Sequence, residues 1–150
     1  MNKRILNKAI NIAKILKNRK QNICAIIVDK KNNILSIGVN FYTKSHPMQK
    51  KYADACGEPD KLWVHAEVNS VSKIPYGRKP YAIYVARVTP SGKVKLAKPC
   101  QICSKLLADR GIKNIYYTTW HCVIYMLYLE EENKKVSRRT LTNNSWIWYT

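Results

Sequence analysis

No apolar run in the 150-residue sequence approaches the roughly 20 residues that a membrane-spanning helix needs. The N-terminus mixes charged and apolar side chains, so it lacks the apolar core of a signal peptide. These absences predict a cytoplasmic protein with no membrane partner. In that compartment the five cysteines are expected to be free thiols or metal ligands rather than disulfides.

Acidic residues are scarce as well. Nine Asp and Glu side chains stand against 27 Lys and Arg, which gives a formal net charge of +18. Residues 1–28 contain seven basic side chains and no acidic one. Such a surface attracts phosphates, either on a mononucleotide or on a polymer. The alternative is a Lys-rich composition solvated on helix faces, so a nucleic-acid partner stays open.

Internal repeats are absent, and we expect a single domain spanning 1–150. Its core should cover about 1–129, and a charged and aromatic extension should follow at 130–150. Eight of the fifteen aromatic residues lie within 116–149. We therefore expect this tail to pack across the sheet or onto another subunit of a homo-oligomer. An aromatic shelf on which bases stack is the functional alternative.

Apolar spacing predicts a domain in which helices and strands alternate. The run 40–60 shows little periodicity, so we expect a long loop with at most one helical turn, forming a wall of the substrate pocket. Only three residues separate the last two expected strands, which favours an antiparallel pairing between them. The expected elements, in order, are a helix at 3–17, a hairpin of strands 23–28 and 34–39, a helix at 65–73, a strand at 81–88, a helix at 100–110, and strands at 112–119 and 123–129.

Two short segments carry the residues that can do chemistry. His65-Ala66-Glu67 offers an imidazole and a carboxylate, and Pro99-Cys100-Gln101-Ile102-Cys103 offers two thiolates three residues apart. One imidazole and two thiolates leave a tetrahedral zinc with an open position, as in catalytic zinc sites. A closed structural site would need a fourth Cys or His nearby, and the sequence offers only dispersed candidates. His46 and Cys56 could form a second metal site, but two isolated residues carry little weight.

Glu67 is hard to explain as a fourth ligand. Water at the open position of a zinc ion becomes more acidic, and a general acid/base beside the metal is what such a water needs. Both motif segments are expected at helix N-termini, whose positive ends favour thiolates. Glu67 is therefore the candidate catalytic residue.

The paired pattern H-x-E…P-C-x-x-C is the signature of the zinc base deaminases. With its order of helices and strands, the chain resembles the cytidine deaminase superfamily, and specifically its cytidine/deoxycytidylate type, over roughly 1–129. The resemblance implies a three-layer α/β/α sandwich around a mixed five-stranded sheet. It also implies that His65, Cys100 and Cys103 hold one Zn²⁺ per chain. Glu67 would then shuttle protons while the exocyclic amine leaves C4 of a cytosine base as ammonia.

The resemblance also implies substrate contacts. Asn40 stands where relatives contact the sugar, and Ala66 and Pro99 would offer backbone groups to the base edge. The chain departs from the family where Phe41 to Pro47 replace the usual small residues and proline after that asparagine. The basic loop 40–60 offers further candidate substrate contacts, among them Phe41. Lys44, Lys50 and Lys51 of this loop are the candidates for binding a phosphate.

Three functions follow, in order of preference. The first is hydrolytic deamination of a free cytosine nucleoside or nucleotide, with deoxycytidylate (dCMP) as the preferred substrate. The second is an editing deaminase on DNA or RNA, directed at cytosine or adenine, because the signature does not distinguish the two bases. The third is a zinc module that binds nucleic acid without chemistry. Glu67 argues against the third, since structure alone does not need that carboxylate.

Overall fold

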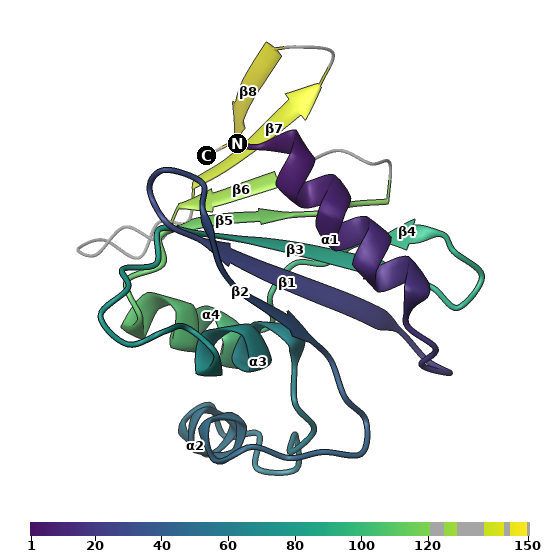
Figure 1. The fold of residues 1–150 in the computed structure, drawn as a ribbon, viewed down its shortest axis with the longest axis vertical. Coiled ribbons are helices and arrows are strands. Elements are labelled where there is room, and N and C mark those ends of the chain that lie inside the picture. Colours follow the sequence, from purple (N-terminus) through teal and green to yellow (C-terminus); the bar gives the residue numbers. More distant parts are fainter. Residues whose placement is uncertain (121–124, 129–136, 143–144, 150) are drawn as a thin grey trace.

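The computed structural model describes residues 1–120, 125–128, 137–142 and 145–149 (Figure 1). The elements are α1 (Lys3–Ile15), β1 (Asn22–Val28), β2 (Ile34–Val39), α2 (Pro47–Ala55), α3 (Ala66–Ser72), β3 (Ala82–Val88), β4 (Val94–Lys95), α4 (Gln101–Asp109), β5 (Asn114–Tyr117), β6 (Tyr125–Tyr128), β7 (Ser137–Thr142) and β8 (Ser145–Tyr149). Among the described residues, no helix has the length and apolar character needed to cross a bilayer.

The predicted mixed five-stranded sheet is confirmed as the order β2-β1-β3-β5-β6. β1 runs antiparallel to β2 and β3, and β3 runs parallel to β5. β5 and β6 pair antiparallel, as the short connection between them predicted. The sheet also contains strands that the sequence did not predict: β7 and β8 continue it beyond β6, and β4 pairs with β3.

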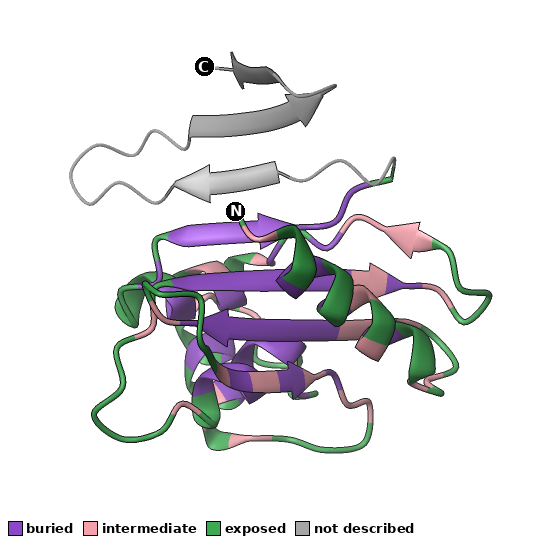
Figure 2. Cartoon of the chain, turned by 45° about the horizontal axis from the view of Figure 1, so that its top comes forward, coloured by how far each residue is buried: buried purple, intermediate pink, exposed green. Residues whose placement is uncertain are grey.

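Helices cover both faces of the sheet, which makes the predicted three layers (Figure 1). α1 packs on one face against β1 and β3. α3 and α4 lie on the other face, and α2 lies outside them against α4. The central strands β1 and β3 are buried along most of their length (Figure 2). Alternate side chains of each strand point to opposite faces of the sheet, so each strand contributes apolar side chains to the core on both faces. This explains why their sequences are continuous apolar runs rather than alternating ones.

α1 forms where the apolar stripe predicted it and ends two residues earlier. Asn2 begins the helix, and its side chain accepts a hydrogen bond from the Arg4 amide. Ile5, Ala9 and Ala13 are buried against the sheet. The backbone turns to an extended conformation at Leu16, so the last two residues of the predicted helix are not helical.

The expectation of a loop with at most one helical turn over 40–60 is wrong, because α2 occupies nine residues of it. The His46 side chain caps the helix by accepting from the Met48 amide at 3.1 Å, and Pro47 fills the first turn, where a missing N–H costs nothing. The buried positions of α2 include Gln49 and Tyr52. The sequence analysis missed α2 because Gln49 occupies a buried position that is usually hydrophobic, and this interrupts the apolar periodicity of the helix.

The C-terminal tail contributes its backbone to the sheet. β7 pairs with β6, and β8 pairs with β7, both antiparallel. Residues 130–136 of the predicted charged extension lie outside the described residues. The packing or base stacking predicted for the aromatic side chains of the tail also concerns side chains that the structure does not describe.

Gly38 allows α3 to lie directly on β2. A Cβ at this position would overlap the carbonyl oxygen of Ala66 and the amide nitrogen of Ser70. Both are helix backbone atoms, which cannot rotate away as a side chain could. The contact also fixes the N-terminal turn of α3, which carries Glu67.

We expect Gly38→Ala to lower the free energy of unfolding by about 3 kcal/mol. This is the upper end of the usual destabilisation by overpacking, because the added methyl group meets backbone atoms. For a chain of this size the melting temperature should fall by about 10 °C. Gly111→Ala is the matched control: its φ of 68° strains alanine, but an added Cβ meets nothing within 4 Å. It should cost only about 1 kcal/mol. Equal losses in the two variants, measured by thermal unfolding, would contradict the packing argument.

Candidate active site

Three side chains from two helix N-termini converge at one point. His65 is the residue preceding α3, and Cys100 is the residue preceding α4, with Cys103 in the first turn of α4. The His65 Nδ1 atom lies 3.3 Å from Cys103 Sγ and 3.5 Å from Cys100 Sγ. Neither His65 nor Cys100 caps its helix with its side chain. Both side chains are instead directed toward each other.

The donor set and its spacing fit a zinc ion. The ligand atoms of His65, Cys100 and Cys103 all lie within 4.8 Å of one another. Ordinary zinc–sulfur and zinc–nitrogen bonds in a tetrahedron place sulfur and nitrogen about 3.6 Å apart. The observed nitrogen–sulfur distances of 3.3 and 3.5 Å are close to that value. The three residues could therefore hold zinc through Nδ1 and two sulfurs with little movement.

The pKa values of the Cys100 and Cys103 thiols shift in opposite directions. A hydrogen bond from Cys103 lowers the pKa of Cys100 to about 4, and a further bond to His65 adds to this effect. The same bond, together with burial, raises the pKa of Cys103 well above its ordinary value. The hydrogen bond to Cys100 raises the pKa of His65. Cys100 is thus a thiolate at neutral pH, and Cys103 would lose its proton on binding a metal.

Glu67 lies beside this cluster with only 6% of its surface exposed. Burial raises the pKa of its carboxyl group. Its negative charge adds to the rise in the pKa of Cys103, and it lines the same cavity as His65 and Cys100. A buried carboxyl group with a raised pKa, next to a metal site, can hold a proton and pass it on.

Over residues 1–119 the sequence matches the family described as the cytidine and deoxycytidylate deaminase zinc-binding region. The chain belongs to this family. Membership makes it a zinc-dependent hydrolytic deaminase, in agreement with the donor set at the helix N-termini. No curated protein matches the sequence significantly.

A solved structure of a cytidine deaminase shares the fold. Cytidine deaminase from Mycobacterium leprae superposes with a TM-score of 0.54 at 16% identity, covering 84% of this chain and 93% of that one. Cytidine deaminase from Mycobacterium tuberculosis gives a TM-score of 0.48 at 18% identity, covering 78% of this chain and 84% of that one. At such low identity the first comparison establishes the fold alone.

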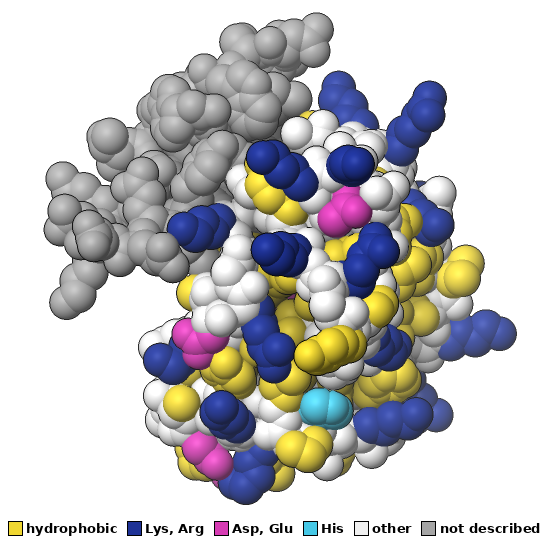
Figure 3. Space-filling view, turned by 60° about the vertical axis from the view of Figure 1, so that its left-hand side comes forward, with side chains coloured by type: hydrophobic (Ala, Val, Ile, Leu, Met, Phe, Trp, Pro, Cys, Tyr) yellow, Lys and Arg dark blue, Asp and Glu magenta, His cyan; other side chains and the backbone are white. Residues whose placement is uncertain are grey.

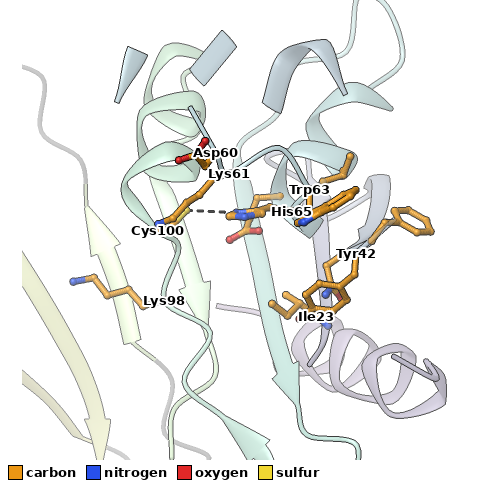
Figure 4. Close-up of a pocket in the computed structure, with 12 residues that line it drawn as sticks. Ile23, Tyr42, Asp60, Lys61, Trp63, His65, Lys98 and Cys100 are labelled. Carbon is orange, nitrogen blue, oxygen red and sulfur yellow. Dashed lines mark hydrogen bonds between the residues drawn. The ribbon is translucent and has the colours of Figure 1, made fainter. Parts of the chain in front are cut away.

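A cavity of about 440 Å³ opens onto the cluster (Figure 4). In the view of Figure 4, Lys98 lies on one side of the His65–Cys100 pair, and Trp63 and Tyr42 lie on the other. The described residues that line the cavity are Ile23, Asn40, Phe41, Tyr42, Asp60, Lys61, Trp63, Val64, His65, Glu67, Lys98 and Cys100. Most of its wall comes from the segment after β2, the segment before α3 and the segment before α4, and Ile23 of β1 and Glu67 of α3 complete it.

Asn40, predicted as a sugar contact, lies on the cavity wall and also closes the end of the sheet. Its Oδ1 atom accepts a hydrogen bond from the Ile23 amide at 2.8 Å. Its Nδ2 atom donates to the Gln21 carbonyl at 3.1 Å. Because these bonds hold the amide to β1, any contact with a sugar would use the second hydrogen of Nδ2.

Some of the other predicted substrate contacts lie on the cavity wall, and others lie away from it. Phe41 lines the cavity, whereas Ala66 and Pro99 are buried next to the metal ligands and are not part of its wall. The Lys44 ammonium lies 4.6 Å from the centre of the Phe41 ring, at the edge of the site. Lys51 lies on α2 over the Tyr52 ring at 5.8 Å, away from the cavity wall.

The sequence analysis did not single out Lys61, Trp63 or Lys98. Lys98 immediately precedes Pro99, and Lys61 and Trp63 lie within four residues of His65. This proximity to the motif residues was the sequence feature that could have identified them. Lys61 forms an ion pair with Glu58, which raises the pKa of the lysine, and the negative charge of nearby Cys100 adds to this rise.

The suggested second metal pair, His46 and Cys56, stands at opposite ends of α2. They are ten positions apart along the helix, which corresponds to about 15 Å. The His46 ring nitrogen Nδ1 already caps the helix. In the part of the chain that the structure describes, His65, Cys100 and Cys103 form the only cluster of three or more metal-binding side chains.

Proposed function

We propose that this deaminase converts a free cytosine nucleotide, with dCMP as the preferred substrate, to the uracil form and releases ammonia. One observation supports the chemistry above all: a buried carboxyl group, Glu67, lies in the same cavity as a histidine and two cysteines at zinc-ligand spacing. His65, Cys100 and Cys103 would hold the ion. Bound zinc would supply an acidified water as the nucleophile.

Glu67 would move the protons. The reaction adds one water at C4 of the base and releases the exocyclic amine as ammonia. The Glu67 carboxylate would accept a proton from the attacking water and deliver it to the ring nitrogen of the base. It would then accept the remaining proton of the new hydroxyl group at C4 and deliver it to the departing amine, which leaves as ammonia. Its burial keeps bulk water from competing for that proton.

A phosphate group on the sugar would lie farther from the metal than the base. Lys98 on the cavity wall and Lys44 beside Phe41 are the cations that we assign to its recognition. Lys61 lies closer to the metal cluster and is already paired with Glu58, so it suits this role less well. We also propose a cytoplasmic homo-oligomer. The location is supported by the free cysteines among the described residues, and the assembly remains a prediction from the sequence.

A panel of substrates tests this function. We expect ammonia release to be fastest with dCMP among cytidine, deoxycytidine, their monophosphates, single-stranded DNA and transfer RNA. Lys98→Ala and Lys44→Ala should each lower kcat/KM for dCMP about tenfold, the equivalent of 1.4 kcal/mol. The same variants should change kcat/KM for deoxycytidine less than twofold. Lys51→Ala, which the sequence also nominated, is the matched control away from the cavity wall. Equal losses for dCMP and deoxycytidine would contradict phosphate recognition.

A polynucleotide substrate is the second candidate, and the rim of the cavity favours it. Phe41 and Tyr42 each have a lysine ammonium over the ring, from Lys44 and Lys20 respectively, and Trp63 is 51% exposed. Figure 3 shows basic side chains spread among hydrophobic ones over one face of the molecule. Half-buried rings with cations beside them, together with the exposed Trp63 ring, suit the stacking of bases along a strand.

Salt dependence separates the two candidates. A strand that contacts many cations loses affinity with a log–log slope of roughly −0.7 per phosphate contact. We expect a shallow slope for deamination of dCMP. An oligonucleotide that is deaminated as fast as dCMP, with a steep slope, would replace the first candidate by the second.

A further inference from the structure

Gln49 of α2 is a polar side chain with no exposed surface, and it is bonded at both ends. Its Nε2 atom donates to the Lys61 carbonyl at 3.0 Å. Its Oε1 atom accepts from the His65 amide at 3.3 Å. One amide group therefore holds both ends of the five-residue segment 61–65.

This segment forms one wall of the active site. Lys61, Trp63 and His65 within it all line the cavity (Figure 4). The segment also supports the loop after β2, because the Val64 amide donates to the Lys44 carbonyl and the Phe41 amide donates to the Val64 carbonyl. A displacement of the segment would therefore move a metal ligand and two walls together.

The His65 amide needs an outside partner because of its place in the chain. His65 directly precedes α3, and in a capping box the N–H at this position is bonded by a Glu or Gln side chain three residues later. Here that residue is Val68, which has no polar atom. Gln49 takes over this task from another helix. The His65 ring and the Glu67 carboxyl group then remain available for the metal and the substrate.

We propose that Gln49 is a positioning residue that sets the zinc affinity of the site by fixing the backbone of His65. The inference rests on the zinc site of the proposed function. Both parts of the amide are needed, since the acceptor binds the His65 amide and the donor binds the Lys61 carbonyl. Groups that orient metal ligands in this way change metal affinity by about 10- to 100-fold.

The chain offers a matched control on the same helix. Tyr52 of α2 donates its hydroxyl to Asp109 of α4 at 2.9 Å. Tyr52→Phe removes this anchor of α2 and leaves segment 61–65 untouched. A loss of zinc affinity in Gln49→Met alone would therefore come from the segment and not from looser docking of the helix.

The experiment compares zinc binding to the full chain and its variants, by competition with a chromophoric chelator. Gln49→Met, which keeps the volume and loses both bonds, should bind zinc about 10- to 100-fold more weakly. Its cobalt-substituted form should show an altered visible spectrum, which reports ligand geometry directly. Tyr52→Phe should bind zinc within twofold of the wild type with an unchanged cobalt spectrum.

Gln49→Glu provides a second variant in case Gln49→Met does not fold. Its carboxylate keeps an acceptor for the His65 amide and loses the donor for Lys61, so its zinc affinity should fall between wild type and Gln49→Met. Wild-type affinity and an unchanged cobalt spectrum in the Gln49 variants would overturn the proposal. So would an equal loss in Tyr52→Phe. Zinc binding is measured without substrate, so the result stands apart from whether cytosine nucleotides are deaminated.

Discussion

Glu67→Gln is expected to retain zinc and to lose at least about 1,000-fold in kcat, the equivalent of about 4 kcal/mol in the activation barrier. Glutamine fills the same buried volume, and Glu67 is not one of the three metal-binding side chains, so the metal site should persist. It cannot accept the proton of the attacking water. Zinc content by metal analysis and ammonia release by a coupled assay measure the two expectations separately.

Asp60→Asn is the matched control for Glu67→Gln. Asp60 lines the same cavity, but it is exposed. Its replacement removes one negative charge near the substrate without removing the buried proton carrier, and kcat should stay within about threefold. Loss of zinc from Glu67→Gln would instead make Glu67 a ligand. Near-normal turnover in that variant would place the chemistry elsewhere.

The central strands and the metal cluster could be predicted because local patterns determine them. β1 and β3 are continuous apolar runs, which is what a strand buried on both faces requires. Cys100 and Cys103 are three residues apart in a helical turn, so their side chains share one side of α4. Such features depend on residues that are close in the sequence, so they can be predicted without knowledge of the fold.

The rest of the site depends on contacts between distant residues. Gln49 and His65 are sixteen positions apart, and a buried glutamine in a polar sequence carries no apolar signal that would reveal α2. The sequence analysis assigned phosphate recognition to Lys44, Lys50 and Lys51 because they lie in a basic loop. Which lysine reaches the cavity depends on where α2 directs the chain, and the structure puts Lys98 on the wall instead of Lys51.

The strands of the C-terminal tail also depend on contacts with residues that are distant in the sequence. An aromatic segment at the C-terminus indicated burial, but the pairing of β7 with β6 depends on a free sheet edge. That edge exists only because β6 is the last strand of the five-stranded core. A sequence pattern can suggest a strand and cannot by itself say which edge it joins.

Cys103→Ala is expected to weaken zinc binding by more than about 100-fold, because loss of a ligand must exceed the effect of losing a group that only orients one. Deamination should disappear at zinc concentrations that saturate the wild type. Cys24→Ala is the matched control, since both cysteines have no exposed surface. Cys24 packs in the core between α1 and the sheet, and Cys103 packs on the opposite face.

The two cysteines differ in what their sulfur faces. Burial alone raises the pKa of Cys24 to about 12, so it stays a neutral thiol surrounded by apolar side chains. Cys103 faces the Cys100 sulfur and the His65 ring. Both alanine variants should lose comparable stability when metal-free, because each removes one buried sulfur. Only Cys103→Ala should then lose the additional stability that zinc gives the wild type. Thermal unfolding with and without zinc measures this difference, and full zinc occupancy in Cys103→Ala would refute the ligand assignment.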